Sequence, residues 1–400
     1  MELRKDMLLD TWEVKGSDFE QLYEVTEAID RATKYVPMKT NELGLFTLNS
    51  MSSDAVNGYL HNKVGSAIIT YEMNDLYAKH GATPELISEL KNNSMMLFDL
   101  GGHLFYTTHS VLKTLCQRAG SPMGDAALRR EPAIRFHRDA LYASYMRTVP
   151  SDCHVIFREA EGAKKVIAVL TDRHAPISQT ESISTAIDGF SESLGKPNLK
   201  WFRINQYETV IYVEYPEQSA DFSNVVRENQ TVTIPADVIP GIMIRTSDSG
   251  DSSFTVIGTM KIGSTIVYVP SAHFARAHTK RATVDAIAKE LEKKVFVEFT
   301  KVPERLCDLM MIDIFDPVSI VAKIAKHCAI KKMLGLGVEN DVVNNISCEL
   351  NPTINYSAYD IAMMFLREGA RLEKERNRDD TINRIRNCFV QALFFKYEEL

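Results

Sequence analysis

The period of the hydrophobic pattern changes twice along this chain of 400 residues, and this change constrains its fold more than any other feature. After a capping-box sequence at residues 17–20, apolar residues such as Phe19, Leu22 and Ile29 recur at helical spacing, which predicts a helix that Pro37 ends. From Cys153 the chain consists of short runs of Val, Ile, Tyr and Phe separated by Gly, Asn and Asp, which is typical of strands and turns. After about residue 280 the helical period returns.

This order predicts an α+β fold with a central, mainly antiparallel sheet flanked by N-terminal and C-terminal helices. We expect a mainly helical region over 1–150, an antiparallel sheet core over 151–270 and a helical region over 271–400. Antiparallel pairing is favoured because the strand candidates are joined by short connections, whereas parallel strands need crossovers of about a dozen residues.

Local signals predict individual elements within these regions. Glu161 and Gly162 indicate a hairpin between strands at 154–158 and 165–170, and Gly195 is expected to end a helix that contains Ile183 and Phe190. Further predicted elements are helices over 66–79, after Thr83, after Thr108, after Val284, after Asp316, over 358–378 and over 381–395; strands at 200–204, 209–215, 231–234, 241–245, 254–261 and 265–269; and linkers near 41–57 and 335–341.

Composition excludes several classes of protein. Lys and Arg total 46 against 53 Asp and Glu, a net charge of −7, which disfavours a globally basic polyanion binder but permits a local basic face. We expect no secretory signal at the N-terminus and no membrane span, because Lys323 and Lys326 interrupt the apolar stretch at 319–330. The expected location is the cytoplasm.

No cofactor or metal site is expected. The six scattered cysteines lack metal-ligand spacing and are interpreted as reduced thiols, and His273 and His278 have no third ligand nearby in the sequence. The glycine pairs near 101 and 335 lack the residues of a nucleotide-binding loop. The sequence at 247–250 is that of a turn whose Ser and Asp side chains bind their own backbone, with a ligand contact as the alternative.

A local excess of positive charge lies between residues 261 and 332, where we count thirteen basic and eight acidic residues. It can be an ordinary solvated surface, or an anion-binding face with Tyr268 and Phe274 near enough to stack on bases. The candidate nucleic-acid-binding residues are Lys261, Arg276, Lys280, Arg281, Lys323 and Lys326.

Two turns are expected to approach one another, at residues 171–176 and 247–250, because each follows a strand of the predicted sheet. Four charged residues would then gather there: Asp172, Arg173, Arg245 and Asp248. They can form a structural ion-pair network or an anion site, and the network is favoured because each Arg has an acidic residue close in sequence.

Three segments in order resemble the phage/plasmid-like protein family, a domain of unknown function carried by bacteriophages, prophages and plasmids. They are VIAVLTDRHAPI at 166–177, PGIMIRTSDSG at 240–250 followed by the strand at 254–260, and TINYSAYDIAMMF at 353–365. The likeness covers about residues 100–395, and the chain departs from the family pattern at 261–268. The resemblance implies a mobile-element origin and an α+β core, and supplies no activity. If the chain is phage-encoded, the expected location is the cytoplasm of the host cell, with a virion as an alternative.

Three functions remain open from the sequence. The first is a non-catalytic phage or mobile-element protein that handles nucleic acid, single-stranded if any, in an accessory or annealing role in replication or recombination. The second is a structural or assembly protein that forms homo-oligomers. The third is a hydrolase or nuclease with Asp152, Asp172 and Asp248 around a metal, for which the spacing offers no support.

Overall fold

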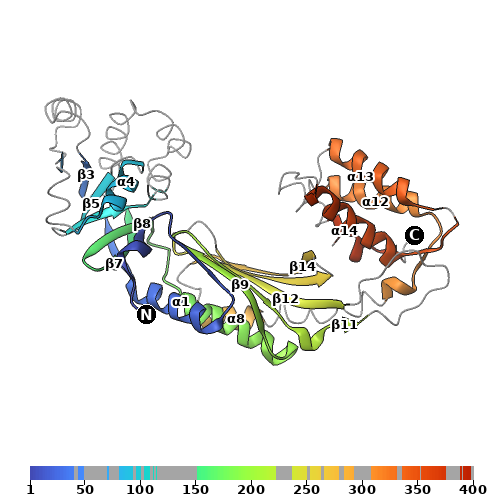
Figure 1. Cartoon of the computed structure of the whole chain (residues 1–400), viewed down its shortest axis with the longest axis horizontal. Coiled ribbons are helices and arrows are strands. Elements are labelled where there is room, and N and C mark those ends of the chain that lie inside the picture. The colour runs from blue at the N-terminus through green and yellow to red at the C-terminus, as the bar shows by residue number, and fades with distance from the viewer. Residues whose placement is uncertain are drawn as a thin grey trace.

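The structure is a computed structural model of the whole chain, and Figure 1 shows its arrangement. The part of the chain that it describes comprises residues 1–39, 44–48, 70–71, 81–92, 96–100, 103–108, 111, 114, 151–221, 237–249, 253–262, 265–278, 283–291, 308–330, 336–351, 353–374, 388–389 and 391–397. The expected strand at 231–234 and most residues of the helices expected over 66–79, after Thr108 and over 381–395 lie outside these residues. Within the first of these helices the expectation is wrong for Thr70 and Tyr71, which form a short strand, whereas Val111 and Thr114 are helical as expected.

The protein is α+β, as its hydrophobic pattern predicts. A central sheet occupies the middle of the molecule and pairs its strands antiparallel in the order β1-β9-β10-β12-β13-β14 (Figure 1). Its strands are β1 (Glu13–Gly16), β9 (Asn198–Asn205), β10 (Thr209–Glu214), β12 (Asp237–Thr246), β13 (Phe254–Ile262) and β14 (Thr265–Arg276), with β11 (Ala220–Asp221) paired to β12.

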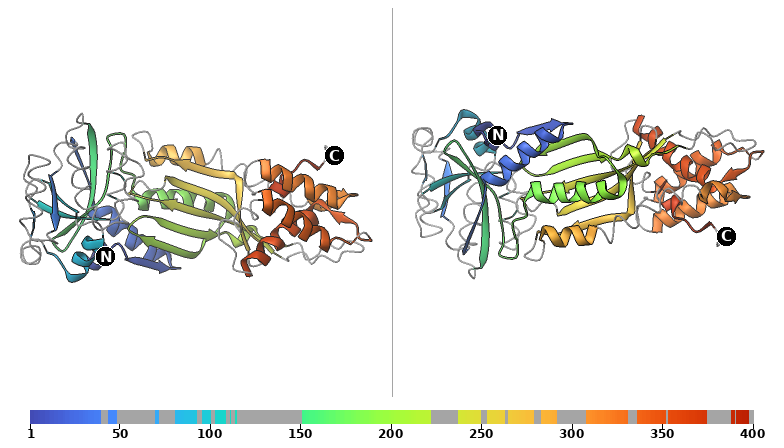
Figure 2. Two further views of the ribbon diagram at one scale, coloured as in Figure 1. Left: turned by 90° about the horizontal axis from the view of Figure 1, so that it is seen from above. Right: turned by 90° about the horizontal axis from the view of Figure 1, so that it is seen from below.

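Helices cover one face of the central sheet. Figure 2 shows α1 (Phe19–Ala32), α8 (Gln179–Leu194) and α9 (Val284–Leu291) in front of the strands when the molecule is viewed from below. Apolar side chains of α8 such as Ile187 and Phe190 pack with Phe202 and Ile211 of the sheet in one buried core. Since burial of each such side chain contributes about 1.5–3 kcal/mol, this layer holds the helices on the sheet.

The helix boundaries follow local capping chemistry. The backbone N–H of Gln21 donates to the carboxylate of Asp18 at 2.9 Å, so α1 is capped by Asp18 rather than by Ser17. Ser178 caps α8 by accepting from the N–H of Glu181 at 3.1 Å, and Gly195 ends that helix with a φ of 85°. The predicted start after Thr83 is confirmed for α4 (Pro84–Asn92), because the Thr83 hydroxyl accepts from the N–H of Leu86.

A second, mixed sheet lies at the N-terminal end of the molecule, in the order β2-β7-β8-β6-β5-β3-β4 (Figure 1). Its strands are β2 (Thr33–Lys39), β3 (Gly44–Leu48), β4 (Thr70–Tyr71), β5 (Met96–Leu100), β6 (His103–Thr107), β7 (Asp152–Ala160) and β8 (Ala163–Thr171). The pairs β6–β8 and β3–β4 are parallel. The predicted hairpin is confirmed, since Glu161 and Gly162 both have positive φ between β7 and β8.

This second sheet corrects the expected position of the strands, which were confined to residues 151–270. Strands before residue 150 join both sheets, and their partners lie far along the chain: β1 pairs with β9, and β2 pairs with β7. Pro37, expected to stop a helix, lies in β2 instead, where it is tolerated because β2 is the edge strand. Local periodicity could not reveal β1 and β2, since only long-range pairing stabilises them. By contrast, β5 and β6 pair with each other over a short connection, and this local hairpin was missed.

A buried lysine fastens the first residues of the chain and α4 to the N-terminal sheet. The ammonium of Lys165 on β8 donates at 2.7 Å to the carbonyl of Leu8, the last residue of the short 3-10 helix η1 (Lys5–Leu8). It also contacts the carboxylates of Asp10 at 2.7 Å and Glu89 at 2.9 Å. Two carboxylates and a carbonyl thus replace the water that Lys165 loses on burial.

The C-terminal end of the molecule is helical and lies beyond the far ends of the central strands (Figure 1). It consists of α12 (Pro317–Ile330), α13 (Leu336–Glu349) and α14 (Ala358–Lys374), with β15 (Asp313–Ile314) paired to β16 (Tyr356–Ser357); a 3-10 turn, η4 (Pro216–Gln218), follows β10. The linker expected near 335–341 is wrong, because α13 begins at Leu336 and buries Val342 and Ile346.

Candidate functional site

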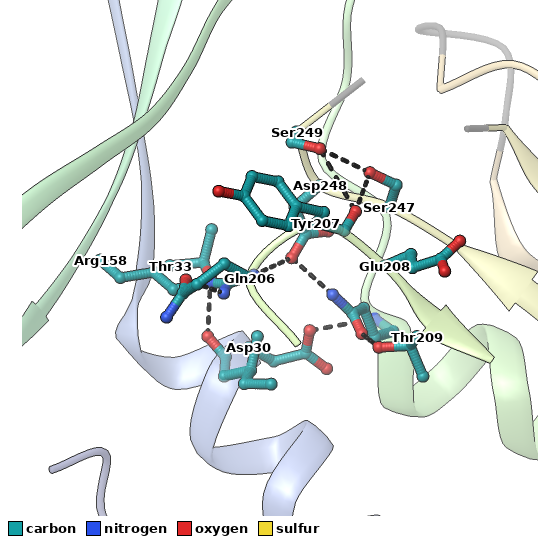
Figure 3. Close-up of polar contacts among 12 residues, drawn as sticks. Asp30, Thr33, Arg158, Gln206, Tyr207, Glu208, Thr209, Ser247, Asp248 and Ser249 are labelled. Atoms are coloured by element: carbon teal, nitrogen blue, oxygen red, sulfur yellow. Dashed lines mark hydrogen bonds and ion pairs between the residues drawn. The ribbon is translucent and has the colours of Figure 1, made fainter. Parts of the chain in front are cut away.

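A buried ionic cluster joins the two sheets, and Asp248, one of the predicted site residues, lies in it (Figure 3). The guanidinium of Arg158 on β7 contacts the Asp248 carboxylate, just after β12, at 3.0 Å. Both side chains are nearly inaccessible to solvent. The same Arg158 donates to the side chains of Gln206 at 2.9 Å and Thr33 at 3.3 Å, and Gln179 donates to Asp248 at 2.6 Å.

This cluster has the properties of a structural joint. Arg158 donates to Thr33 of β2, to Gln206 after β9 and to Asp248 after β12, which are three separate parts of the chain. Gln179 continues the network by accepting from the hydroxyl of Thr209 at 2.8 Å. A buried guanidinium whose three nitrogens each donate to a protein group has little capacity left for a ligand, so we assign the cluster to stability.

Neighbouring contacts extend this joint to the two helices beneath it. Asp30 of α1 accepts from the Ser178 hydroxyl at 2.8 Å and from the backbone N–H groups of Gln179 and Thr180, each at 3.0 Å. A carboxylate at the N-terminus of α8 is stabilised by the helix dipole as well as by these hydrogen bonds.

The four residues of the predicted network are not brought together. Asp248 pairs with Arg158, whereas Arg245 is half exposed and contacts Glu208 at 3.2 Å. Asp172 and Arg173 lie exposed in the turn after β8. Arg158 was not recognised from the sequence because it lies at the end of the predicted strand at 154–158, where a charged side chain is ordinarily solvated.

Residues of the predicted turn at 171–176 contact His278, which follows β14. The ring of His174, in the turn after β8, stacks on the ring of His278 with 5.4 Å between centroids and 3° between planes. The backbone N–H of Ala175 donates to the carbonyl of His278 at 3.2 Å. Burial, helped by the neighbouring His278 and His154, lowers the pKa of His174 to about 4. Burial also lowers the pKa of His278, against the opposing effect of Asp248.

The face of the central sheet opposite the helices has a different character, and no described helix lies on it (Figure 2). Its side chains alternate with those of the core: along β13, Thr255, Ile257 and Lys261 are partly exposed, whereas Phe254 and Val256 are buried. Because successive side chains of a strand point to opposite faces, this alternation identifies an accessible sheet surface. We call it the open face.

Cations outnumber carboxylates among the described side chains of the open face. The cations are Lys15, Lys200, Arg203, Arg245 and Lys261, and the carboxylates are Glu13, Glu208 and Glu214. Glu208 contacts both Arg203, at 2.5 Å, and Arg245, at 3.2 Å. Glu214 is likewise placed between Lys200, at 3.6 Å, and Lys261, at 3.5 Å. Each of these two carboxylates is shared by two cations, which leaves a positive surplus.

The predicted nucleic-acid-binding residues are dispersed. Lys261 lies on the open face, whereas Arg276 contacts Glu290 of α9 at 2.6 Å on the side of the helices. Lys323 and Lys326 are exposed on α12, at the C-terminal end of the molecule. Lys280 and Arg281 lie outside the described residues. Of the two aromatic residues, Phe274 is buried in the core and Tyr268 lies on the open face.

For a metal site, a membrane span and disulfides, the structure describes only part of the chain. Among the described histidines, cysteines and carboxylates, no group of three or more could hold a metal ion. Within the same residues, no helix is both long and apolar enough to cross a membrane. Cys153, Cys328, Cys348 and Cys388 form no disulfide, and Cys116 and Cys307 are not among the described residues.

Comparison of the chain with protein-family models, with curated proteins and with solved structures gives no match.

Proposed function

We propose that this protein is a non-catalytic nucleic-acid-handling protein of a phage or other mobile element, with an accessory or annealing role in replication or recombination. The observation that carries the proposal is the positive surplus on the open face of the central sheet, in a chain whose net charge is −7. The mobile-element origin rests on the family resemblance of the three segments. The expected place of action is the host cytoplasm.

The geometry of the charges supports phosphate binding over a purely structural role. Lys15, Arg203 and Arg245 lie in register across β1, β9 and β12, with Val210 of β10 between the two arginines. Their ion pairs are largely solvent-exposed, and such pairs contribute only about 0–1 kcal/mol each. These cations can therefore exchange carboxylates for phosphates at little cost.

Binding is expected to be salt-dependent and largely independent of base sequence. Each phosphate contact releases counterions and contributes a slope of about −0.7 in a plot of log affinity against log salt for single strands. The negative charge of the whole chain opposes association beyond the Debye length of about 10 Å at 0.1 M salt, so only the local surface attracts a polyanion.

Charge removal on the open face tests this proposal. Lys15→Gln combined with Arg245→Gln is expected to weaken oligonucleotide binding about 10-fold or more at 50 mM salt and to flatten the salt slope by roughly one to two units. Fluorescence anisotropy of a labelled oligonucleotide between about 50 and 200 mM salt measures both quantities.

The matched control is Lys323→Gln combined with Lys326→Gln, which removes the same charge from the exposed side of α12. We expect this variant to bind as the wild type does. Loss of affinity in the control but not in the open-face variant would move the binding site to the C-terminal helices. Absence of any binding at 50 mM salt would refute the proposed function.

A second candidate function, a structural or assembly role through homo-oligomers, is favoured by an exposed apolar patch before α12. The side chain of Phe315 is 99% exposed, and those of Met311 and Val318 are 79% and 48% exposed. Beside Phe315 lies a cavity of about 350 Å³ that is lined also by Ile314, Val318, Leu350 and Ile354. We infer that the partner is a second copy of the chain. Across a two-fold axis, the projecting ring of Phe315 in each copy can enter the cavity of the other copy.

Phe315→Ser is expected to convert a self-associating protein into a monomer. Sedimentation velocity at several protein concentrations measures this change, and Phe394→Ser, at a side chain that is 39% exposed, serves as the control. A wild-type protein that stays monomeric at high concentration would contradict the oligomer.

A further inference from the structure

A row of large side chains crosses the open face at right angles to the strands. Trp201 of β9 is in register with Tyr212 of β10, which is in register with Met243 of β12. The hydroxyl of Tyr268 on β14 contacts the sulfur of Met243 at 3.4 Å and so continues the row. We call these four residues the aromatic row. It spans four strand spacings of about 4.8 Å, or roughly 19 Å.

The most accessible member of the row is held in place by the others. Trp201 is 37% exposed, and its ring lies 6.1 Å from that of Tyr212, between centroids, at an angle of 41°. Tyr212 is itself buried, and its hydroxyl donates to the Glu214 carboxylate at 3.2 Å. Burial and the adjacent Glu214 raise the pKa of Tyr212, which keeps this hydroxyl protonated as a donor.

A glycine provides the space for this arrangement. A Cβ atom on Gly241 would lie 2.6 Å from the carbonyl oxygen of Val213 and 3.3 Å from the ring of Tyr212. The absence of a side chain at Gly241 thus lets the Tyr212 ring lie close over β12. An aromatic surface that is already fixed loses little conformational entropy when it binds a ligand.

Cations flank the row on both sides. On one side of the aromatic row, Lys15, Arg203 and Arg245 lie in register with one another across the strands. On the other side, Lys200 and Lys261 lie near Glu214. Base stacking needs exposed rings, and a phosphate backbone needs cations close to those rings. The open face places both within one surface.

We infer that the aromatic row binds the unpaired bases of an extended single strand, with Trp201 and Tyr268 as the stacking residues and with the backbone phosphates on Lys15, Arg203 and Arg245. This inference rests on the proposed function and names its substrate class. Single strands are favoured over duplex because the faces of paired bases are covered by their neighbours in the stack. Little sequence preference is expected, since every base has a face that can stack.

Intrinsic fluorescence tests the contact directly, because Trp12 and Trp201 are the two tryptophans of the chain. In the Trp12→Phe variant, selectively excited tryptophan fluorescence comes from Trp201 alone, and a thymidine oligonucleotide is expected to quench it. In the Trp201→Phe variant, where Trp12 remains, the same titration is expected to leave the fluorescence nearly unchanged. Circular dichroism verifies that both variants are folded.

Affinity gives the second measurement. Trp201→Ala is expected to weaken single-strand binding by about 5-fold to 150-fold, which corresponds to the loss of one base stack, whereas Trp201→Phe retains most of the affinity. Phe394→Ala, which removes an aromatic ring of similar exposure at the C-terminal end, is the matched control and should change nothing. Duplex of the same length should bind the wild type more weakly than the single strand does.

The outcomes separate the two claims. The stacking inference is overturned, and the proposed function stands, if binding is salt-dependent but any one of three results is found. These results are no quenching of Trp201, unchanged affinity in Trp201→Ala, or duplex bound as tightly as single strand. Absence of binding to every oligonucleotide would overturn both. Quenching together with the affinity loss in Trp201→Ala would support the inference.

Discussion

Replacement of Arg158 by methionine is expected to lower the free energy of unfolding by about 3–5 kcal/mol, the largest effect of any single substitution we propose. The variant leaves the Asp248 carboxylate buried with Gln179 as its remaining donor, and it deprives Gln206 and Thr33 of a hydrogen-bond donor. An uncompensated buried charge is costly because the protein interior cannot replace the water that the charge has lost. Urea denaturation followed by circular dichroism measures the loss.

Arg173→Met is the control for this substitution, because Arg173 is exposed in the turn after β8. We expect that variant to change the free energy of unfolding by less than about 0.5 kcal/mol. The double variant Arg158→Met with Asp248→Leu should recover part of the loss, since removal of both partners leaves no buried charge. Equal stabilities of Arg158→Met and Arg173→Met would show that the cluster does not hold the two sheets together.

Acidification is expected to lower the free energy of unfolding through the stacked histidines. For His174 alone the loss is up to about 3 kcal/mol, since each pKa unit corresponds to about 1.4 kcal/mol. The pKa of His174 is about 4 in the folded protein, whereas an exposed histidine has a pKa near 6.5. Between these values the unfolded chain binds a proton that the folded protein does not. Stability is therefore full above pH 6.5 and falls as the pH decreases toward 4.

The groups around this pair determine which histidine protonates first. His174 faces His278, His154 and the ring of Tyr35, which offer it no negative charge, whereas Asp248 favours the protonated form of His278. His174→Phe retains a ring for stacking and removes the titration, so its stability should depend less on pH between 6.5 and 4. Thermal melts across this range measure the difference.

Carboxylates also lose stabilising interactions in acid, so the comparison between variants isolates the histidine. His327→Gln, at an exposed position of α12, is the control and should follow the wild-type pH profile. If His174→Phe shows the same pH dependence as the wild type, the stacked pair does not carry the effect.

Local elements of this fold are readable from the sequence because each depends on residues close together in the chain. Glu161 and Gly162 form the hairpin turn that their types predict, and Gly195 ends α8 in the left-handed region of φ. β9 and β13 alternate between buried and more accessible residues, as their sequences indicate, whereas β10 is buried throughout. By contrast, β2 was taken for the end of a helix, since its pairing with β7 joins segments more than a hundred residues apart.

In the candidate site, too, the sequence indicated some of the residues, whereas only the structure showed which residues are neighbours. Lys261, Tyr268 and Arg245 were recognisable as charged or aromatic residues in strands, and the sequence alone determined their alternation with the core. Only the tertiary structure decided which strands are neighbours, and this brings Trp201 beside Tyr212 and places Arg158 against Asp248, ninety residues away in the chain. The physical reason is that strand order and register depend on the burial of whole faces and on buried polar groups finding partners, and neither quantity is defined until the chain is packed.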